Sequence, residues 1–361
     1  MRTLHRVLVF PAWGDNPYLN LMSLAPRASG YEFRGATLFE SLLKMAGELE
    51  PNDVLHLHWT APILQRAATE AEAEAGLARF RELLDGLRDR SIRVIWTVHN
   101  QLPHELAYRD AEIALYRLLA ERADAIHVMS PSTAAVLAGI CELPSDRIRQ
   151  IPHPSYLGVY GVPPSRSEAR RALGVEQLAP TVLFLGQMRP YKGLGTLLGA
   201  LRLLSEEGRP LPTLLLAGAA TPEVRAEIES LIPEGLDVVS KFEFVPDGEV
   251  STWFAAADLA VFPYTAILNS GSVHLSAAFG VPAMLPNEAH LVEQFGDEPW
   301  VGFFDVEDSV CSMADEISRR LADLGGADHD ERFGGFNEAI SPWRISVKYS
   351  ALLDEVTAAT A

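Results

Sequence analysis

A run of small polar residues begins what the sequence predicts to be a buried helix, in the stretch LNSGSVHLSAAFGVP (268–282). The first turn of a helix attracts anions through its unpaired backbone N–H groups and its dipole. Serine adds hydroxyl groups there, and glycine lets a ligand approach the backbone closely. The competing interpretation is an ordinary serine N-cap, worth about 1 kcal/mol, with Gly271 needed only for close packing. The candidate ligands for phosphate oxygens are Asn269, Ser270, Gly271, Ser272 and Val273.

A second candidate anion site follows the apolar run TVLFLG (181–186), in the sequence GQMRPYKG. Gly186 is expected to open a turn, with Arg189 and Lys192 beside the start of the next helix. Ordinary helices favour acidic residues at that place, so two cations there point to an anionic ligand. Solvated surface charge is the alternative. Together with the Ser-Gly-Ser helix start, the two cations predict a site for a nucleotide diphosphate.

The loop after the first predicted strand, AWGDNPY, holds a carboxylate that could act as a base. Pro17 suits the first position of a helix and Asn16 suits the N-cap, which leaves Gly14 and Asp15 in the loop. Gly14 is expected to contribute to donor binding, and Asp15 is a candidate catalytic residue. A carboxylate also favours a helix N-terminus without any chemical role, so this second interpretation of Asp15 stays open.

Histidines end two further predicted strands. In VLHLHW the alternation of a strand places His56 and His58 on one face, with His58 at the strand's end. His56 is expected to be structural, and a structural role stays open for His58 as well. His99 ends the next strand, and Glu105 follows it. Because ligands of doubly wound sheets bind beyond the carboxyl ends of the strands, these residues predict a wet cleft at this edge.

The elements that must position these residues alternate between short apolar runs and amphipathic stretches, which is the pattern of parallel βαβ units. A length of 361 residues predicts two domains, and a Pro-, Gly- and Ser-rich linker lies at 153–166. The predicted domains are 1–160 and 161–340, with a closing helix at 341–361. Strands are expected at 6–11, 53–59, 93–99, 125–129, 147–152, 181–186, 213–218, 236–245, 259–263, 282–286 and 301–305.

Charge and composition exclude several classes of protein. The net charge of −18 repels phosphate backbones, so nucleic acid is not an expected partner. No run of about 18 apolar residues and no signal-peptide pattern occurs, so we expect a cytoplasmic protein. Peripheral membrane contact through a local patch stays open. Cys141 and Cys311 are expected to be buried reduced thiols, and their spacing does not fit zinc.

The order of these motifs resembles the GT-B glycosyltransferases, in particular the family 4 group and its bacterial polysaccharide mannosyltransferase-like relatives. The likeness rests on FLGQMRPYKGLGTLLGAL, LLLAG, FEFVPDGEVSTWFAAADLAVFPY and AAFGVPAML in the second half, and more loosely on the first loop and VHN. It implies an α/β fold of the GT-B type, with two Rossmann-like domains facing each other across a cleft. The segment SPWRISVKYSALLDEV (341–356) resembles the C-terminal helix that crosses back to the first domain.

The resemblance also implies donor contacts that this sequence keeps only in part. Family 4 members usually carry two glutamates, eight residues apart, which contact the donor sugar and the ribose. Ile267 and Leu275 stand at these positions, so retaining stereochemistry is not carried over. The NSGS version resembles a divergent branch in which backbone and hydroxyl groups replace the first carboxylate. Glu288 and Glu293 fall where the family often has a glutamate near the nucleotide, and either could take over ribose binding.

The implied activity is transfer of a hexose from a nucleotide-diphosphate sugar, GDP-mannose or a UDP-sugar, to a hydroxyl acceptor in polysaccharide biosynthesis. Neither a cofactor nor a metal is expected, because cations and helix N–H groups stabilise the departing diphosphate and no Asp-x-Asp triplet ends a predicted strand. An inverting reaction needs a base that takes the acceptor's proton. The candidates, in order, are Asp15, His99, Glu105 and His58.

Two other functions stay open from the sequence. One is a sugar-nucleotide-binding partner subunit that has lost catalysis, and the other is a GT-B-like sugar-nucleotide epimerase. The acceptor also stays open, as a carbohydrate, a lipid-linked substrate or a small molecule, and so does the oligomeric state. The candidate aromatic platforms for the acceptor are Trp13, Tyr18, Trp59 and Tyr108, although aromatic residues at these spacings more often belong to the core.

Overall fold

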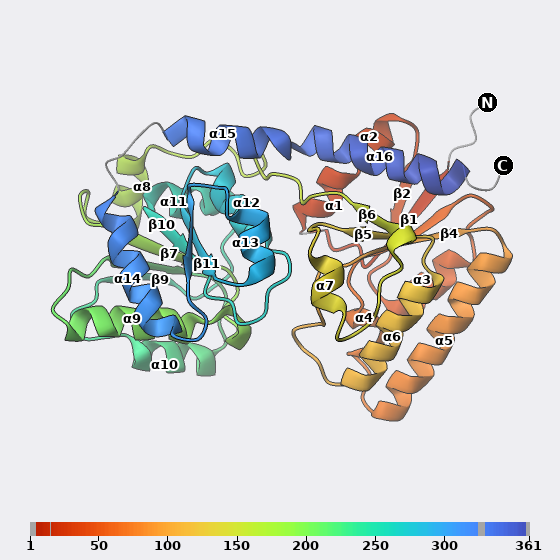
Figure 1. Ribbon diagram of the computed structural model, residues 1–361, viewed down its shortest axis with the longest axis horizontal. Coiled ribbons are helices and arrows are strands. Elements are labelled where there is room, and N and C mark those ends of the chain that lie inside the picture. The colour runs from red at the N-terminus through yellow and green to blue at the C-terminus, as the bar shows by residue number, and fades with distance from the viewer. Residues whose placement is uncertain (1–4, 15, 324–328, 359–361) are drawn as a thin grey trace. The chain divides into compact units, whose positions relative to one another are not determined.

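The computed structural model describes residues 5–14, 16–323 and 329–358 (Figure 1). The chain forms two compact units. The first unit comprises residues 1–154 together with 342–361, and the second comprises 155–341. Each unit contains a six-stranded parallel sheet flanked by helices, so the predicted α/β fold with two Rossmann-like sheets is confirmed.

The sheet of the first unit has the strand order β2-β1-β3-β4-β5-β6, and all neighbours are parallel. Its inner strands are apolar along most of their length, as expected where helices cover both faces. The strands are β1 (Arg6–Phe10), β2 (Glu32–Gly35), β3 (Val54–Leu57), β4 (Arg93–Thr97), β5 (Ala125–Val128) and β6 (Ile148–Gln150). The helices are α1 (Pro17–Met22), α2 (Leu24–Ala28), α3 (Phe39–Ala46), α4 (Ala61–Leu64), α5 (Glu70–Asp89), α6 (Arg109–Arg122), α7 (Thr133–Leu137) and α16 (Pro342–Ala358), with a 3-10 turn η1 (Ser145–Arg147).

Helices α5 and α6 lie side by side in Figure 1, and α5 packs on β4. The buried residues Phe80, Leu84 and Leu87 recur at helical spacing, so one face of α5 is apolar. The helix begins after Thr69, whose hydroxyl accepts a hydrogen bond from the Glu72 backbone N–H. Local capping and an apolar stripe thus account for the longest helix of this unit among the described residues.

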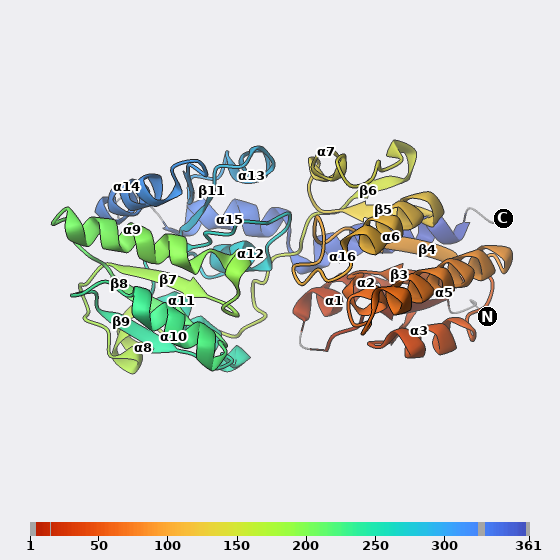
Figure 2. The same ribbon diagram turned by 90° about the horizontal axis from the view of Figure 1, so that it is seen from below.

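The sheet of the second unit has the strand order β12-β11-β10-β7-β8-β9, again parallel throughout. Helices α9 and α14 cover one face and α8 and α11 the other (Figure 2). The strands are β7 (Thr181–Leu185), β8 (Thr213–Ala217), β9 (Val238–Lys241), β10 (Leu259–Val261), β11 (Ala283–Pro286) and β12 (Val301–Phe304). The helical elements are α8 (Arg166–Leu173), the 3-10 turn η2 (Pro190–Lys192), α9 (Leu194–Glu206), α10 (Pro222–Leu231), α11 (Asp247–Ala256), α12 (Gly271–Ala278), α13 (Ala289–Phe295), α14 (Ser309–Ala322) and α15 (His329–Ala339).

A buried ion pair fixes α8 to the second sheet. The Arg170 side chain is fully buried, and its Nη2 lies 2.8 Å from Asp258 Oδ2. The same carboxylate oxygen accepts a hydrogen bond of 2.9 Å from the Thr181 backbone N–H. The guanidinium also donates to backbone carbonyls in the 176–179 loop. Buried charges are tolerated when they are paired and hydrogen-bonded in this way.

Helix α16 packs against α1 and α2, so the C-terminal segment belongs to the first unit. Tyr349 OH lies 2.6 Å from Nδ1 of the buried His56 in β3. Ser346 Oγ accepts a hydrogen bond of 2.6 Å from the Ala25 backbone N–H and donates one of 2.9 Å to the Met22 carbonyl. Polar groups buried under α16 are therefore satisfied by the elements that it covers.

All of the predicted strands overlap strands of the structure, which adds β2, an edge strand that the sequence analysis missed. Apart from the half-buried Phe33, the residues of β2 are exposed, so it has no apolar alternation to detect. Both cysteines are free thiols, but the expectation that both are buried is wrong for Cys311, because it lies on the solvent side of α14. None of the helices within the described ranges combines the length and the hydrophobicity that a bilayer crossing needs.

Candidate functional site

The candidate donor site of the second unit lies in the loops that follow β7 and β10, which are neighbouring parallel strands. Parallel strands end at the same edge of a sheet, where doubly wound folds bind their ligands. Gly186, directly after β7, has a φ of 138°, so the predicted turn is present. Gly218, after β8, approaches it so closely that a Cβ there would lie 1.9 Å from the Gly186 carbonyl oxygen. Two glycines therefore allow the backbones to meet at this edge.

The loops after β7 and β10 are also held against each other. Gly193, with a φ of 68°, lies so near Pro263 that a Cβ would stand 1.8 Å from its carbonyl oxygen. The Thr265 backbone N–H donates a hydrogen bond of 2.9 Å to the Tyr191 carbonyl. These contacts fix the η2 turn, and with it Lys192, beside the loop that leads to α12.

Lys192 reaches Tyr264 in that neighbouring loop. Its Nζ donates a hydrogen bond of 2.9 Å to Tyr264 OH and lies 4.6 Å from the centroid of the ring, which is a cation–π distance. Burial alone would raise the pKa of the Tyr264 phenol, but the Lys192 charge and hydrogen bonds with Lys192, Ser272 and Ser270 lower it instead. Burial alone would lower the pKa of Lys192, but Tyr264 and Tyr191 raise it above its ordinary value. Lys192 is therefore a fixed positive charge at neutral pH.

The N-terminus of α12 is connected to this lysine through Tyr264. Ser270 occupies the N-cap position, but its side chain makes no capping hydrogen bond and joins Tyr264 instead. The ordinary N-cap interpretation therefore does not describe this hydroxyl. Gly271 and Ser272 are half-buried, and Val273 is fully buried. The first N–H groups of a helix lack intrahelical partners, so α12 adds a positive helix end to the ammonium.

The other predicted donor residues of this unit lie around the same loops. Arg189 and Asn269 are half-buried, directly before η2 and one residue before the N-cap of α12. Glu288 holds the N-cap position of α13, and its carboxylate lies 3.5 Å from His290 Nδ1. Burial raises the pKa of Glu288, and His290 opposes that rise. Glu293 is exposed on α13.

A hydrogen bond ties the start of α13 to the loop before α12, since His290 Nε2 lies 2.9 Å from the Ile267 carbonyl. The Ile267 side chain is 5% exposed and that of Leu275 is 7% exposed. Both positions that usually carry a glutamate in the family thus hold packed apolar side chains. These side chains cannot hydrogen-bond a sugar or a ribose, so polar recognition must come from other residues.

In the first unit, Asp15 lies outside the described residues, and Gly14 before it is exposed. Asn16 caps α1, with its Oδ1 accepting a hydrogen bond of 3.0 Å from the Tyr18 backbone N–H, and Pro17 is the first helical residue. The local interpretation of this loop is therefore confirmed. The role of Asp15 as a base stays a prediction.

The structure brings His58 and His99 together at the ends of β3 and β4, with 3.0 Å between His58 Nδ1 and His99 Nε2. The Trp59 ring stacks on His99 with centroids 4.0 Å apart at 16°, and Trp13 lies 4.7 Å from Trp59. His58 is buried, whereas His99, Trp59 and Trp13 are partly exposed. Burial, followed by the fields of neighbouring imidazoles, holds the pKa of His58 and of His99 well below 6.5. Both imidazoles are therefore neutral at pH 7, the state in which an imidazole can accept a proton.

Behind this pair lies a chain of buried hydrogen bonds that the sequence analysis did not foresee. His56 Nε2 lies 2.7 Å from Thr97 Oγ1, which lies 2.9 Å from His127 Nδ1. His127 Nε2 in turn lies 2.8 Å from the Ile151 carbonyl. With Tyr349 on its other nitrogen, His56 is fully engaged, so the expectation of a structural role is confirmed. Burial lowers the pKa of His127 to about 4.

Glu105 is exposed in the loop before α6. The carboxylate that the structure buries nearby is Glu112 of α6, which accepts hydrogen bonds from Thr60 and, at 2.6 Å, from Gln65 Nε2. Thr60 follows Trp59 directly, so Glu112 supports the loop after β3. Among the aromatic candidates for the acceptor, Tyr18 is buried, and Tyr108 OH donates a hydrogen bond of 2.8 Å to the Ala67 carbonyl.

Residues that matter for the donor site but escaped the sequence analysis include Tyr264 and His290. Each follows an apolar strand closely, at the edge where ligand residues are expected. That position was the available signal for Tyr264, in the sequence FPY. The role of His290 depends on a carbonyl contact, for which the sequence holds no pattern.

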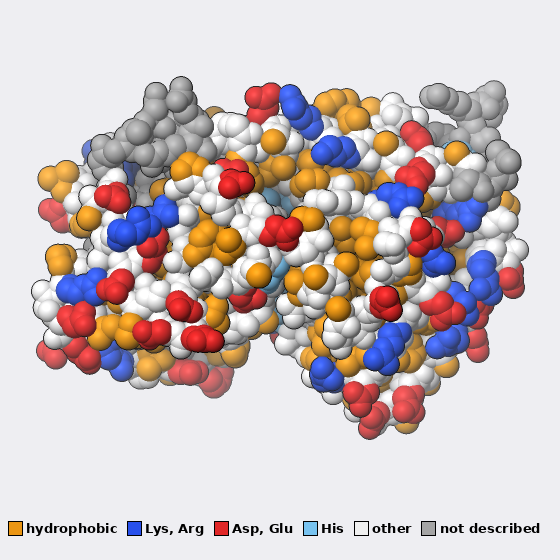
Figure 3. All heavy atoms as spheres, viewed as in Figure 1, with side chains coloured by type: hydrophobic (Ala, Val, Ile, Leu, Met, Phe, Trp, Pro, Cys, Tyr) orange, Lys and Arg blue, Asp and Glu red, His pale blue; other side chains and the backbone are white. Residues whose placement is uncertain are grey.

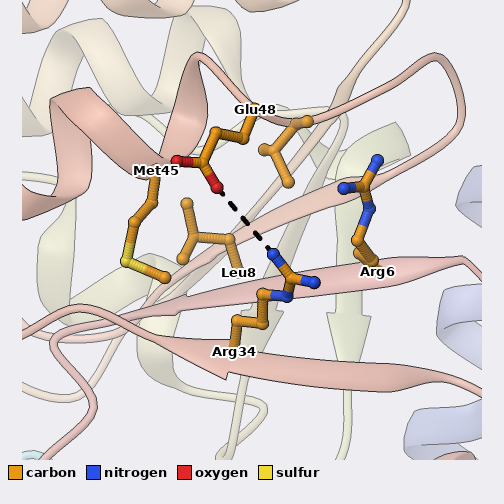
Figure 4. Close-up of a pocket in the computed structure, with 6 residues that line it drawn as sticks. Arg6, Leu8, Arg34, Met45 and Glu48 are labelled. Carbon is orange, nitrogen blue, oxygen red and sulfur yellow. Dashed lines mark ion pairs between the residues drawn. The ribbon is translucent and has the colours of Figure 1, made fainter.

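A small pocket in the first unit lies at the opening residues of β1, away from the carboxyl ends of the strands (Figure 4). It is lined by Arg6, Leu8, Arg34, Met45, Glu48 and Leu49, with Arg34 Nη1 3.8 Å from Glu48 Oε2. Its volume of about 10 Å³ is enough for about one water molecule. In the part of the chain that the structure describes, no group of three or more His, Cys, Asp or Glu residues is placed to hold a metal ion.

Comparisons with known families match both halves of the chain. The family model described as "Glycosyltransferase Family 4" matches residues 4–154, and the one described as "Glycosyl transferases group 1" matches residues 179–323. A GDP-mannose:glycolipid 4-beta-D-mannosyltransferase from Xanthomonas campestris pv. campestris is 27% identical over 327 residues, 88% of this chain and 84% of the relative. A D-inositol 3-phosphate glycosyltransferase from Thermobispora bispora is 27% identical over 65% of this chain and 57% of its own length.

Solved structures share the fold at low sequence identity. A sucrose-phosphate synthase from Thermosynechococcus elongatus gives a TM-score of 0.75 at 18% identity, covering 99% of this chain and 100% of its own. Anabaena HepE in complex with UDP gives a TM-score of 0.72 at 15% identity, and the match covers 98% of this chain and 100% of HepE. The sequence relatives are transferases, so neither the partner subunit nor the epimerase is favoured.

Proposed function

Because the chain belongs to the family 4 group of glycosyltransferases with the GT-B fold, we propose that it transfers mannose from GDP-mannose to a hydroxyl group of a glycolipid. Sugar transfer from a nucleotide sugar is the activity of the family. The choice of mannose and of a glycolipid follows the Xanthomonas relative, which aligns with most of the chain.

The observation that carries this proposal is the Lys192–Tyr264 pair beside the start of α12. When the bond between the sugar and the diphosphate breaks, negative charge gathers on the leaving phosphate. Groups that are already fixed and positive stabilise this charge without reorganising. We assign that role to Lys192, to Arg189, and to the N–H groups and hydroxyls from Asn269 to Val273, with Gly186 making room for the phosphates. Glu288 is the proposed ribose ligand, and Glu293 is the second candidate.

The proposed transfer is a single displacement. The acceptor oxygen attacks the anomeric carbon, the bond to the diphosphate breaks, and GDP leaves with the electron pair. The acceptor's proton passes to a base of the first unit. We assign the base to Asp15 and then to His99, Glu105 and His58 in that order, and we assign Gly14 to donor binding. The β-mannoside in the relative's name, formed from an α-configured donor, requires such an inversion.

Partly exposed aromatic rings next to His99 support a place for the acceptor's sugar. Trp13 and Trp59 offer apolar faces of the kind on which pyranose rings stack. The loop that carries Trp59 is held by the buried Glu112, which accepts a hydrogen bond from Thr60. The acceptor's reacting hydroxyl would then lie near the imidazole that Trp59 covers.

The test is a transfer assay with the purified full chain, GDP-mannose and a panel of synthetic glycolipids that differ in their terminal sugar. The expected result is GDP release together with a product heavier by one hexose, and no product from UDP-glucose. Three outcomes would contradict the proposal. They are transfer from UDP-glucose alone, conversion of GDP-mannose to another sugar nucleotide without acceptor, and tight donor binding without turnover.

A matched pair of lysine variants separates donor binding from general damage. Lys192→Met is expected to lower kcat/KM for GDP-mannose by about 100-fold or more, because it removes the fixed charge that faces the leaving group. Lys241→Met, in β9 of the same unit, removes only a surface ion pair with Glu249 and serves as the control. Equal activity of the two variants would refute the assignment of Lys192.

A further inference from the structure

The outer face of the first half of α16 carries apolar and basic side chains together. Trp343 is 56% exposed and Val347 is 46% exposed, one turn apart on the helix. Arg344 and Lys348 follow them at the same spacing, and both are exposed. The opposite face of the helix is buried through Ile345, Tyr349, Leu352, Leu353 and Val356. The apolar packing of α16 on the first unit therefore uses the face opposite to Trp343 and Val347.

Helix α2 extends this face. Ser346, directly before Val347, bonds Ala25 and Met22 and so brings α2 against α16 at this point. Between those two partners lie Ser23 and Leu24, and the Leu24 side chain is 41% exposed. Figure 3 shows basic and hydrophobic side chains next to each other at the upper edge, over α16 and α2.

Arg27 of α2 adds a third cation near this face. Its Nε donates a hydrogen bond of 3.0 Å to Ser23 Oγ, and its guanidinium lies 5.0 Å from the centroid of Phe33. Among the described residues, neither Arg27 nor Lys348 forms an ion pair with a carboxylate. The acidic end of α16 is different, since Glu355 pairs with Arg149 and Asp354 accepts a hydrogen bond from Tyr31. The α16–α2 face, defined here as Leu24, Arg27, Trp343, Arg344, Val347 and Lys348, thus stands out in a chain of net charge −18.

We propose that the α16–α2 face docks this enzyme on an anionic lipid bilayer. Tryptophan favours the boundary between lipid and water, and a helix face that combines it with aliphatic and basic residues binds there in the plane of the membrane. Each lysine or arginine near an anionic surface adds attraction that falls off within a Debye length. The acidic remainder of the chain is repelled by the same surface, so charge selects this face over others. The inference deepens the proposed function, because a glycolipid acceptor resides in a membrane.

The test is co-sedimentation of the full chain, without donor or acceptor, with vesicles of equimolar phosphatidylglycerol and phosphatidylcholine at low ionic strength. The expected results are binding to these vesicles, loss of binding at high salt, and little binding to pure phosphatidylcholine. Two variants test whether the α16–α2 face is the part of the surface that binds the membrane. The double charge reversal R344E/K348E is expected to weaken partitioning by about tenfold or more. Trp343→Ser is expected to weaken it without changing the salt dependence.

A matched control lies in the second unit, where Phe244 is 68% exposed. The double variant F244S/R202E removes an exposed aromatic ring and an exposed cation there, and it should bind vesicles like the wild type. Failure of the wild type to sediment with anionic vesicles would overturn the proposal. Binding of R344E/K348E equal to that of the wild type would also overturn it. So would equal binding of the wild type to neutral and anionic vesicles, because the face would then not select an anionic membrane. Because no sugar is transferred in this assay, its failure is distinct from failure of the proposed function. The surface variants should also keep wild-type activity on a detergent-solubilised acceptor.

Discussion

The hydroxyl group of Tyr264 connects the ammonium of Lys192 to the serines at the start of α12, so its removal should weaken the donor site without emptying it. The variant Tyr264→Phe keeps the ring, and with it the cation–π contact at 4.6 Å. It loses the hydrogen bond of 2.9 Å to Lys192 and the bonds with Ser270 and Ser272. Lys192 would then be positioned by the rings of Tyr264 and Tyr191.

The size of the effect follows from the charge of the partner. A hydrogen bond to a charged group contributes about 1.5 to 3 kcal/mol, so a loss of about 2 kcal/mol is expected, or ~30-fold in kcat/KM. Stability should fall less, by about 1 kcal/mol, because the neighbouring serine hydroxyls can turn toward each other or water. The protein should therefore stay folded at the assay temperature, with a melting temperature only a few degrees lower.

The assay is steady-state GDP release with saturating acceptor, measured for the wild type, Tyr264→Phe, Lys192→Met and the double variant. If Tyr264 acts through Lys192, adding the tyrosine change to Lys192→Met should cost little more. Tyr160→Phe, a tyrosine of the same unit packed on Tyr156, is the control and should keep full activity. Independent, additive losses in the double variant would refute the reasoning, and so would full activity of Tyr264→Phe.

Three further predictions address the first unit and the core of the second. Asp15→Asn or His99→Gln should lower kcat by about 100-fold or more while GDP-mannose affinity stays within about twofold. Near-normal turnover of both variants would remove the first two of the four proposed bases. Burial lowers the pKa of His127 and of His153 to about 4 in the folded chain, against 6.5 ordinarily, so the unfolded chain binds more protons below pH 6.5. The free energy of unfolding in urea should therefore fall as the pH is lowered from 7.5 to 5, by up to about 2 kcal/mol for each histidine. A flat profile over that window would contradict this sign. Asp258→Asn should destabilise the second unit by about 3 kcal/mol or more in the same assay, because the fully buried guanidinium beside it loses its counter-charge, whereas a loss below about 1 kcal/mol would contradict the pairing.

Much of the fold could be predicted because the strands of both sheets are short, apolar and regularly separated by amphipathic helices. That pattern survives in the sequence wherever a strand is covered on both faces, as in LLLAG or VLFLG. It fails for β2, whose residues are mostly exposed at a sheet edge. Exposure of Cys311 was missed for a related reason. Whether a small side chain on an amphipathic helix is buried depends on how the helix is rotated about its axis. That rotation is clear only once Met313 and Ile317 are known to face the core.

The candidate site could be predicted where a residue's position along a strand carries the information. Lys192 and the serines of α12 follow strands β7 and β10 in the sequence, and the parallel pairing of those strands brings them to one edge. The contact between His58 and His99 follows in the same way from neighbouring strands. Tyr264 was missed because an aromatic residue after an apolar strand is usually core, and the sequence gives no sign that a lysine points at its hydroxyl.

The absence of the two family glutamates has an electrostatic consequence for the donor site. A carboxylate near a diphosphate repels it, and in a chain of net charge −18 the surroundings already disfavour an anionic ligand. Buried apolar side chains at 267 and 275 remove two negative charges from the loop and the helix that carry the serines. The field at this edge is then governed by Lys192 and the start of α12, and Tyr264 keeps the pKa of the half-buried lysine above its ordinary value, so that it stays charged. Neutral hydroxyl and amide groups can therefore take over the role of the missing carboxylates in donor recognition. They can hydrogen-bond the sugar hydroxyls without weakening the attraction of the site for phosphate.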